Sequence, residues 1–190
     1  MTNNICFIDF ETTGTNVFAD EPIELGAVLV NHKLQQIDTF FSKIKPSRDV
    51  NISESAYQIH KYRIEDLKNE PNQLTVMNSF FNIFGFDYYL AGWNISFDVP
   101  FLRKLCNSNG MLTEFDKIDY HHLDVQSIVK FLVHINLLPN NITSLSKCAE
   151  YFGIPRHKNH NALEDAYITF NLYKKIKDEL SGLLVSKSIT

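Results

Sequence analysis

Apolar and polar positions alternate with a period of two near the start of the chain. The two faces of residues 5–11 carry Ile5, Phe7, Asp9 and Glu11 on one side and Cys6, Ile8 and Phe10 on the other. This period predicts a β-strand, which we expect to end before Gly14. Two further apolar runs, at 24–30 and 37–41, are joined by a short polar turn at 31–33. Their spacing predicts an antiparallel meander of three strands.

Beyond Pro46 the apolar residues recur at steps of three and four, a spacing typical of helices. The segments expected to be helical are 53–59, 74–84, one opening near Pro100, one through 128–132, 144–152 and 162–183. Apolar runs at 88–93 and 120–123 predict a fourth and a fifth strand. Three strands followed by strands that alternate with helices predict an α/β fold with a five-stranded mixed sheet. We find no internal repeat or linker, so residues 1–190 are expected to form one domain.

Composition and charge narrow the class of protein. Hydrophobic residues make up 44% of the 190 residues, as in an ordinary folded domain. The formal net charge of -4 does not indicate the long basic surface with which proteins bind extended nucleic acid. It is compatible with an enzyme that binds only the end of a strand. Cys6, Cys106 and Cys148 have no paired spacing, which predicts buried, reduced thiols in a cytoplasmic protein. We expect no signal peptide and no membrane-spanning helix.

Two acids in the first strand are the strongest chemical signal. Asp9 and Glu11 share one face, about 7 Å apart along the strand. One such acid is commonly explained as a turn cap or a lysine partner, but two in step within an apolar strand are harder to explain. Unpaired carboxylates on an inner face would be costly. A hard divalent cation, which prefers oxygen ligands, would offset that cost.

Three further candidates lie later in the chain. Asp98 follows a predicted strand, and by itself it is best interpreted as a helix N-cap. His160 and Asp165 are five positions apart, about 140° around a helix, so they would share a site only with Asp165 on the helix and His160 on the preceding loop. The alternatives are a solvated loop histidine and a first-turn acid favoured by the helix dipole. Glu164 is expected to be a surface acid, and Asp124 the N-cap of the next helix.

Four acids and one histidine would together form a site that needs cations. A cluster of carboxylates repels itself unless positive charge fills it. Two divalent ions roughly 3.5–4 Å apart can hold both the attacking water and the leaving oxygen of a phosphodiester. A neutral histidine nearby is suited to take a proton from that water near neutral pH.

Three segments carry a family resemblance. They are Asp9-Phe-Glu-Thr-Thr-Gly14, Asn94-Ile-Ser-Phe-Asp98 and His160-Asn-Ala-Leu-Glu-Asp165, in that order and at wide spacing. In these segments the chain resembles the DEDDh 3′–5′ exonucleases, which include the proofreading subunit of bacterial replicative polymerase, RNase T and oligoribonuclease. The resemblance covers nearly the whole chain. It implies an RNase H-like three-layer fold and two divalent metal ions, Mg²⁺ or Mn²⁺.

The same resemblance implies a role for each candidate in the site. Asp9 would bridge both metal ions. Glu11 and Asp165 would help to hold the ion that carries the nucleophile, and Asp98 would complete the cluster directly or through water. His160 would be the general base.

The resemblance also implies contacts with the substrate. The expected contact residues are Thr12, Thr13, Gly14, His60, Asn94 and Phe97. The chain departs from the family pattern at two positions near the nucleotide pocket. Trp93 replaces a frequent histidine, and Lys61 follows His60 where glycine is more usual. These departures bear on substrate preference and leave the expected chemistry unchanged.

The function implied is hydrolysis of terminal phosphodiester bonds of DNA or RNA to nucleoside 5′-monophosphates, by a two-metal mechanism with a histidine base. The expected partner is the 3′ end of a single strand, and association with a DNA polymerase and formation of a homodimer are both open. One alternative is a catalytically silent scaffold that binds nucleic acid or a polymerase, although all four acids and the histidine are present. Another is a two-metal phosphoesterase for small compounds, although no Gly-rich phosphate loop supports it.

Overall fold

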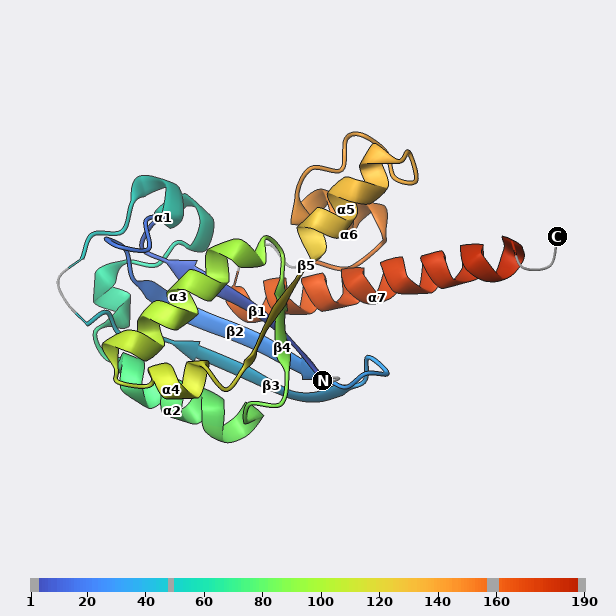
Figure 1. The fold of residues 1–190 in the computed structure, drawn as a ribbon. Helices are drawn as coiled ribbons and strands as arrows, with labels where there is room; N and C mark the ends of the chain where they lie inside the picture. The colour runs from blue at the N-terminus through green and yellow to red at the C-terminus, as the bar shows by residue number, and fades with distance from the viewer. Residues whose placement is uncertain (1–3, 48–49, 157–160, 188–190) are drawn as a thin grey trace.

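A five-stranded mixed sheet forms the centre of the fold. The computed structural model describes residues 4–47, 50–156 and 161–187 (Figure 1). The strands lie in the order β3-β2-β1-β4-β5. Their bounds are β1 Ile5–Thr12, β2 Pro22–Val30, β3 Gln36–Lys43, β4 Tyr89–Gly92 and β5 Asp119–Asp124. The predicted five-stranded α/β fold is therefore confirmed.

The pairing of the strands agrees with the predicted topology. β1 pairs with β2, and β2 with β3, in antiparallel fashion, so the meander of three is confirmed. β4 lies parallel to β1 and to β5. In the antiparallel register Asp9 lies opposite Gly26, and Glu11 lies opposite Glu24. Directly opposite residues share one face of a sheet, so these four residues lie together.

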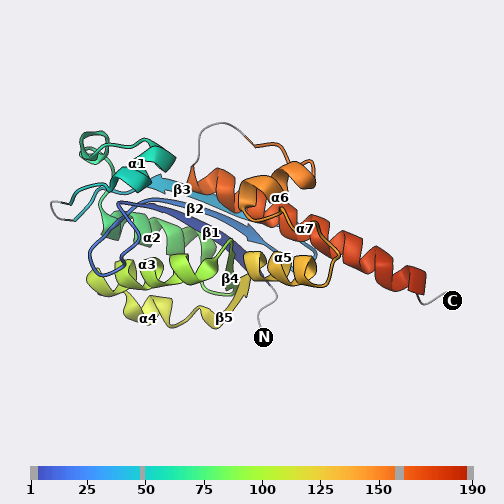
Figure 2. The ribbon, with the colours of Figure 1, turned by 90° about the horizontal axis from the view of Figure 1, so that it is seen from above.

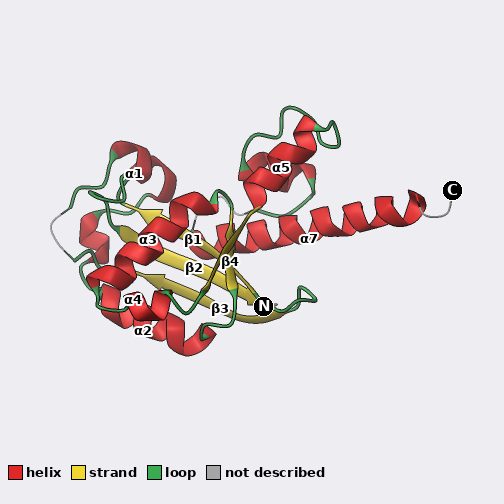
Figure 3. Cartoon of the chain, viewed as in Figure 1, coloured by secondary structure: helices red, strands yellow, loops and turns green. Residues whose placement is uncertain are grey.

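Helices cover both faces of the sheet. Their bounds are α1 Glu54–His60, η1 Ile64–Leu67, α2 Gln73–Phe84, α3 Ile95–Ser108, α4 Leu112–Phe115, α5 Val125–His134, α6 Leu145–Tyr151 and α7 Ala162–Lys187. Seen from above, α2 and α3 lie on one side of the sheet, and α6 and α7 on the other (Figure 2). The three layers, helix, sheet and helix, are also evident when the chain is coloured by secondary structure (Figure 3).

The central strand β1 is apolar on both faces because each face meets a helical layer. Cys6 and Ile8 belong to the core that contains α2 and α3, whereas Ile5 and Phe7 belong to the core that contains α7. All three cysteines are buried and free, as predicted. Within the described part of the chain, no helix has the length and apolarity needed to cross a membrane.

One predicted helix start was wrong. The helix expected to open near Pro100 begins at Ile95, after Asn94 takes a left-handed conformation with φ of 61°. Pro100 therefore lies inside α3, where it has no N–H to donate to the carbonyl of Ser96. The prediction relied on the preference of proline for the first helical position, and it therefore placed the start of α3 about five residues too late. The short helices η1 and α4 were not predicted, because each is only four residues long.

Two residues of β2 fix the first turn of α7 on the sheet. A Cβ atom at Gly26 would collide with the backbone of Ala162 and Leu163, so only glycine permits this close approach. Beside it, the buried Glu24 carboxylate accepts a hydrogen bond from the Ala162 N–H at 2.8 Å. Since Gly26 lies opposite Asp9, the start of α7 is held directly over the acidic face of β1.

We predict that Gly26→Ala destabilises the fold because its methyl group meets a helix backbone. The cost should be about 2–3 kcal/mol in the free energy of unfolding, as for other overpacked sites. Gly182→Ala is the matched control, since nothing lies within 4 Å of a Cβ there. In this exposed part of α7 the same substitution should be neutral or stabilise by up to about 1 kcal/mol. Urea unfolding of both variants measures the difference, and equal effects would contradict the packing argument.

Candidate active site

The four acids predicted from the sequence meet in one hollow. It has a volume of about 370 Å³ and is lined by Asp9, Glu11, Asp98 and Asp165 together with parts of α1, α3 and the segment after β1. Asp9 and Glu11 point to the same face of β1, as predicted. Asp165 comes from the first turn of α7, and Asp98 from α3. Acids far apart in the sequence thus line a single space.

Asp98 reaches the hollow by binding the edge of β1. β4 pairs with β1 only as far as Phe7, opposite Ala91. Three residues further along β1, the Phe10 N–H donates to Asp98 Oδ1 at 3.0 Å. Asp98 is only 2% exposed and lies within the first turn of α3, whose N-cap is Asn94. The N-cap interpretation is therefore excluded.

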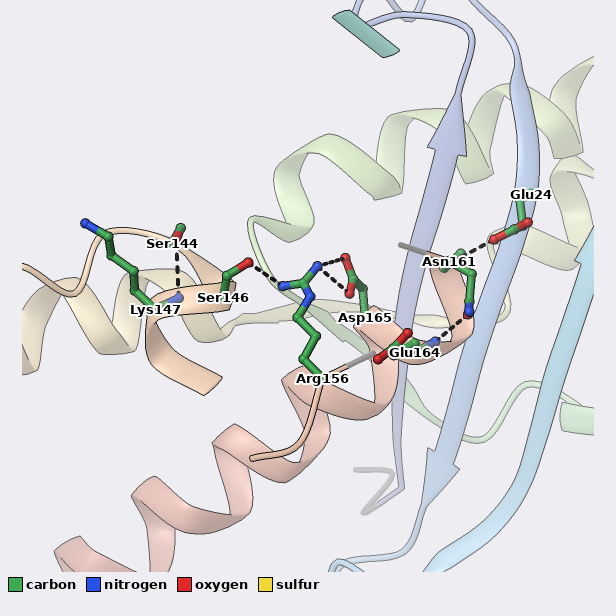
Figure 4. Close-up of polar contacts among 9 residues, drawn as sticks. Glu24, Ser144, Ser146, Lys147, Arg156, Asn161, Glu164 and Asp165 are labelled. Carbon is green, nitrogen blue, oxygen red and sulfur yellow. Dashed lines mark hydrogen bonds and ion pairs between the residues drawn. The ribbon is translucent and has the colours of Figure 1, made fainter. Parts of the chain in front are cut away.

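Asp165 is held by an arginine from outside the helix. Nη2 of Arg156 lies 2.9 Å from Oδ1 and 3.0 Å from Oδ2 of Asp165. Nη1 of the same guanidinium donates to Ser146 Oγ at 2.7 Å, as Figure 4 shows. Arg156 was not identified from the sequence. It lies in a loop and shows no periodicity that would have drawn attention to it.

Three acids in the hollow, Asp9, Glu11 and Asp98, favour their protonated forms. Burial raises the pKa of Asp9 and of Asp98 well above the ordinary value, and the charge of Asp98 raises that of Asp9 further. Burial, followed by the charges of Glu24 and Asp165, raises the pKa of Glu11 to about 8, while Arg156 acts to lower it. Such a cluster gains more from a cation than a solvated set of acids does.

Glu24 is a fifth acid on the face of the sheet that carries Asp9 and Glu11. From the sequence, Glu24 was predicted only to begin a strand. Burial raises its pKa, which its hydrogen bonds from the Tyr62 hydroxyl and the Ala162 N–H lower. Its two oxygens are used by these two donors, so Glu24 anchors α7 and the segment between α1 and η1 to the sheet. A lone acid in the apolar run Pro22–Val30 was the available signal. An unpaired carboxylate inside an apolar strand is as costly at Glu24 as at Asp9 and Glu11, so Glu24 could have been identified on the same ground.

The donor set in the hollow fits a hard divalent cation. Four carboxylates supply oxygen ligands of the kind that Mg²⁺ and Mn²⁺ bind. Burial and the charges of neighbouring acids raise the pKa of three of them, Asp9, Glu11 and Asp98, so a cation placed among these acids would be stabilised. Among the described residues, however, no three Asp, Glu, His or Cys side chains are already arranged to hold an ion. The carboxylate of Asp165 faces Arg156 instead.

The residues expected to contact a substrate lie in two different places. Thr12, Gly14, His60, Asn94 and Phe97 line the hollow. Thr13 lies behind it and is fully buried, with its hydroxyl bonded to Asp20 and to the Glu21 N–H. Its own N–H and carbonyl are also used, by Glu21 and Ser53. The structure thus gives Thr13 a role in the turn that shapes the hollow.

His60 is fixed as a neutral donor in the wall of the hollow. Its Nδ1 accepts the N–H of Tyr62, so the proton lies on Nε2, which is 3.3 Å from the Thr12 carbonyl oxygen. Burial lowers the pKa of His60, which favours this neutral form. Lys61 follows in a left-handed conformation with φ of 62° and ends α1. Glycine adopts that conformation without strain, which explains its frequency at this point in similar chains.

The opening of α3 is positioned by the opening of α5. The Asn94 N–H donates to Asp124 Oδ1 at 3.0 Å, and the same oxygen accepts the Gln126 N–H. Asp124 is therefore the N-cap of α5, as predicted. Phe97 is partly buried against Phe101 and presents part of its ring to the hollow.

His160, the predicted general base, lies outside the described residues. Asp165 is on the first turn of α7, as predicted. Glu164, which was expected to be a surface acid, is half-buried instead, and its backbone N–H donates to Asn161 Oδ1 at 2.8 Å.

Fold and site together define a class. The chain has an RNase H-like sheet whose central strand ends in a cluster of carboxylates. A family model described as "Exonuclease" matches residues 6–173. The chain belongs to this exonuclease family.

Curated relatives share this part of the chain. "DNA polymerase III PolC-type" from Thermotoga maritima is 29% identical over 95% of this chain and 12% of its own length. "3'-5' exonuclease DinG" from Staphylococcus epidermidis is 27% identical over 93% of this chain and 18% of its own length. The chain thus spans less than a fifth of either of these relatives.

Solved structures show the same fold. The zinc-bound form of E. coli exonuclease I with single-stranded DNA matches with a TM-score of 0.83 and 20% identity, over 98% of this chain and 43% of that one. Apo exonuclease I matches with a TM-score of 0.78 and 19% identity, over 94% and 42%. The predicted RNase H-like fold is confirmed.

We predict that, in EDTA, the folded chain loses stability as the pH rises. The pKa of Glu11 is raised from 4.5 to about 8, so the folded state holds a proton that the unfolded chain has released. Stabilisation by that proton is fully present below the lower value and is lost as the pH passes the upper one. The free energy of unfolding should fall by on the order of a few kcal/mol between about pH 5 and about pH 8.5.

Glu11→Gln should flatten this dependence, because it removes a titrating group from the cluster. Glu65→Gln, at an exposed position on η1, is the control and should leave the slope unchanged. Urea unfolding across the pH range measures all three proteins. An identical slope in Glu11→Gln and the unaltered chain would show that Glu11 does not titrate as described.

Proposed function

We propose that the chain is a metal-dependent 3′–5′ exonuclease domain that removes nucleoside 5′-monophosphates from the end of a single strand. The observation that carries the proposal is the meeting of four buried or half-buried carboxylates in one hollow at the end of β1. Membership of the exonuclease family supports the same conclusion.

Asp9, Glu11, Asp98 and Asp165 would hold two divalent ions. When bound, such ions stabilise the charge on the attacking and leaving oxygens of a phosphodiester. The chain contributes the arrangement of its oxygen donors, because β1 fixes two of them and α3 and α7 bring the other two. His160 would accept the proton from the attacking water, as the family resemblance implies.

The rest of the hollow is suited to one terminal nucleotide. Phe97 offers an aromatic surface on which a base or sugar would rest, and Ile59 of α1, which is 54% exposed, lines the same hollow. Aromatic contacts of this kind tolerate any base, because every base has a π-face. His60 holds the Thr12 carbonyl in place and thereby shapes the wall that faces the sugar.

DNA is the substrate that we favour. Relatives of this chain include PolC-type DNA polymerase III, and one of the matching structures of exonuclease I contains single-stranded DNA. A polymerase is accordingly the proposed partner. A catalytically silent binding module is the competing proposal, and the completeness of the acid cluster weighs against it.

We predict that the chain cleaves single-stranded oligonucleotides only with a divalent metal. With Mg²⁺ or Mn²⁺, a 3′ label should be released as a mononucleotide and a 5′-labelled strand should give a ladder. EDTA should stop both. Asp165→Asn should lower the rate by on the order of a thousandfold or more, because it removes a carboxylate on which transition-state stabilisation depends.

Asp178→Asn is the matched control for this experiment. It makes the same change at an exposed position of α7. This variant should keep the full rate. Unimpaired cleavage by Asp165→Asn would show that the site has been assigned wrongly, and folded protein that binds metal but cuts neither DNA nor RNA would favour the binding module.

A further inference from the structure

Arg156 binds Asp165 in the manner of a bound cation. A single nitrogen, Nη2, lies between the two carboxylate oxygens at 2.9 Å and 3.0 Å, so both oxygens converge on one positive group (Figure 4). The guanidinium enters from the loop after α6, on the side away from Glu24 and Asn161. It thereby uses the oxygens that the proposed function assigns to a metal ion.

This ion pair is shielded from water. The side chains of Arg156 and Asp165 are only 15% and 14% exposed. A charge-assisted contact in such a setting is stronger than the same contact on an open surface. Ser146 Oγ accepts from Nη1 at 2.7 Å and holds the other arm of the guanidinium in place. The arginine is therefore positioned, and its contact with Asp165 is not a chance encounter of two long side chains.

The arginine and a divalent ion cannot use Asp165 in the same way at the same time. Two cations on the same pair of oxygens would repel each other at a distance of a few ångströms. Since the Arg156 guanidinium already contacts both oxygens of Asp165, a divalent ion that binds the same two oxygens has to displace it.

We propose that Arg156 is a built-in counter-ion that competes with the divalent metal for Asp165 and so sets the metal affinity of the site. The inference rests on the proposed function for the identity of the site. Arg156 is a positioning residue: it keeps Asp165 in place and offsets its charge until a metal ion replaces the guanidinium. Its loss should make metal binding tighter while making the cluster less stable without metal.

The test is the affinity of the full chain for Mn²⁺, measured by isothermal titration calorimetry without nucleic acid. Arg156→Gln should bind Mn²⁺ about tenfold more tightly than the unaltered chain, which corresponds to about 1.4 kcal/mol. Ser146→Ala changes no charge but frees one arm of the guanidinium, and it should raise the affinity by about threefold. Both variants should also gain more in thermal melting temperature on addition of Mn²⁺.

Lys147→Gln is the matched control. It removes one positive charge from α6, next to Ser146, but the Lys147 ammonium points away from Asp165 (Figure 4). It should leave the Mn²⁺ affinity nearly unchanged. An equal rise in Lys147→Gln and Arg156→Gln would overturn the proposal, because general charge would then explain both.

The remaining outcomes separate this inference from the proposed function. Equal affinity in Arg156→Gln and the unaltered chain, with metal-dependent cleavage intact, would overturn the counter-ion role alone. Tighter Mn²⁺ binding in Arg156→Gln without any nuclease activity would support the counter-ion role and overturn the proposed function. Absence of Mn²⁺ binding in both proteins would overturn both.

Discussion

The site depends on one contact, the seating of the first turn of α7 on strand β2. Gly26 allows the helix backbone to approach the sheet, and the Glu24 carboxylate takes the first free N–H of the helix. Because Gly26 is paired with Asp9, this contact brings Asp165 over the acids of β1. A side chain at Gly26 would lift the helix and separate Asp165 from them, even though the hydrophobic core would still form.

The burial of several acids close together lowers the stability of the fold when they are ionised, although metal binding requires their ionised form. Burial and mutual repulsion raise the pKa of Asp9, Glu11 and Asp98, so the cluster costs free energy when it is ionised. Protons, the Arg156 guanidinium and a divalent cation are three ways of offsetting that charge. The first two leave the acids inactive as metal ligands, whereas the third would make them chemically useful. The structure therefore holds a set of acids whose charge balance depends on pH and metal.

The same fold is used by relatives of far greater length. This chain aligns with about an eighth of the PolC-type polymerases and with less than half of exonuclease I. With exonuclease I it shares the fold, that is, the sheet and its flanking helices. Around that frame lie Trp93, Lys61 with its left-handed backbone, and Arg156 with its contact to Asp165.

The sequence alone determined most of the helices and strands and most of the candidate site residues, because both follow from the spacing of residues close together in the chain. The period of two placed Asp9 and Glu11 on one face of a strand, and apolar spacing gave α7 its start at residue 162. Contacts between distant segments were decided only by the tertiary structure. The α3 start depends on the left-handed Asn94, the role of Glu24 on a helix 138 residues away, and the role of Arg156 on an acid nine residues further along the chain. No local periodicity encodes such contacts, since they arise from the packing of α7 and α3 against β1 and β2.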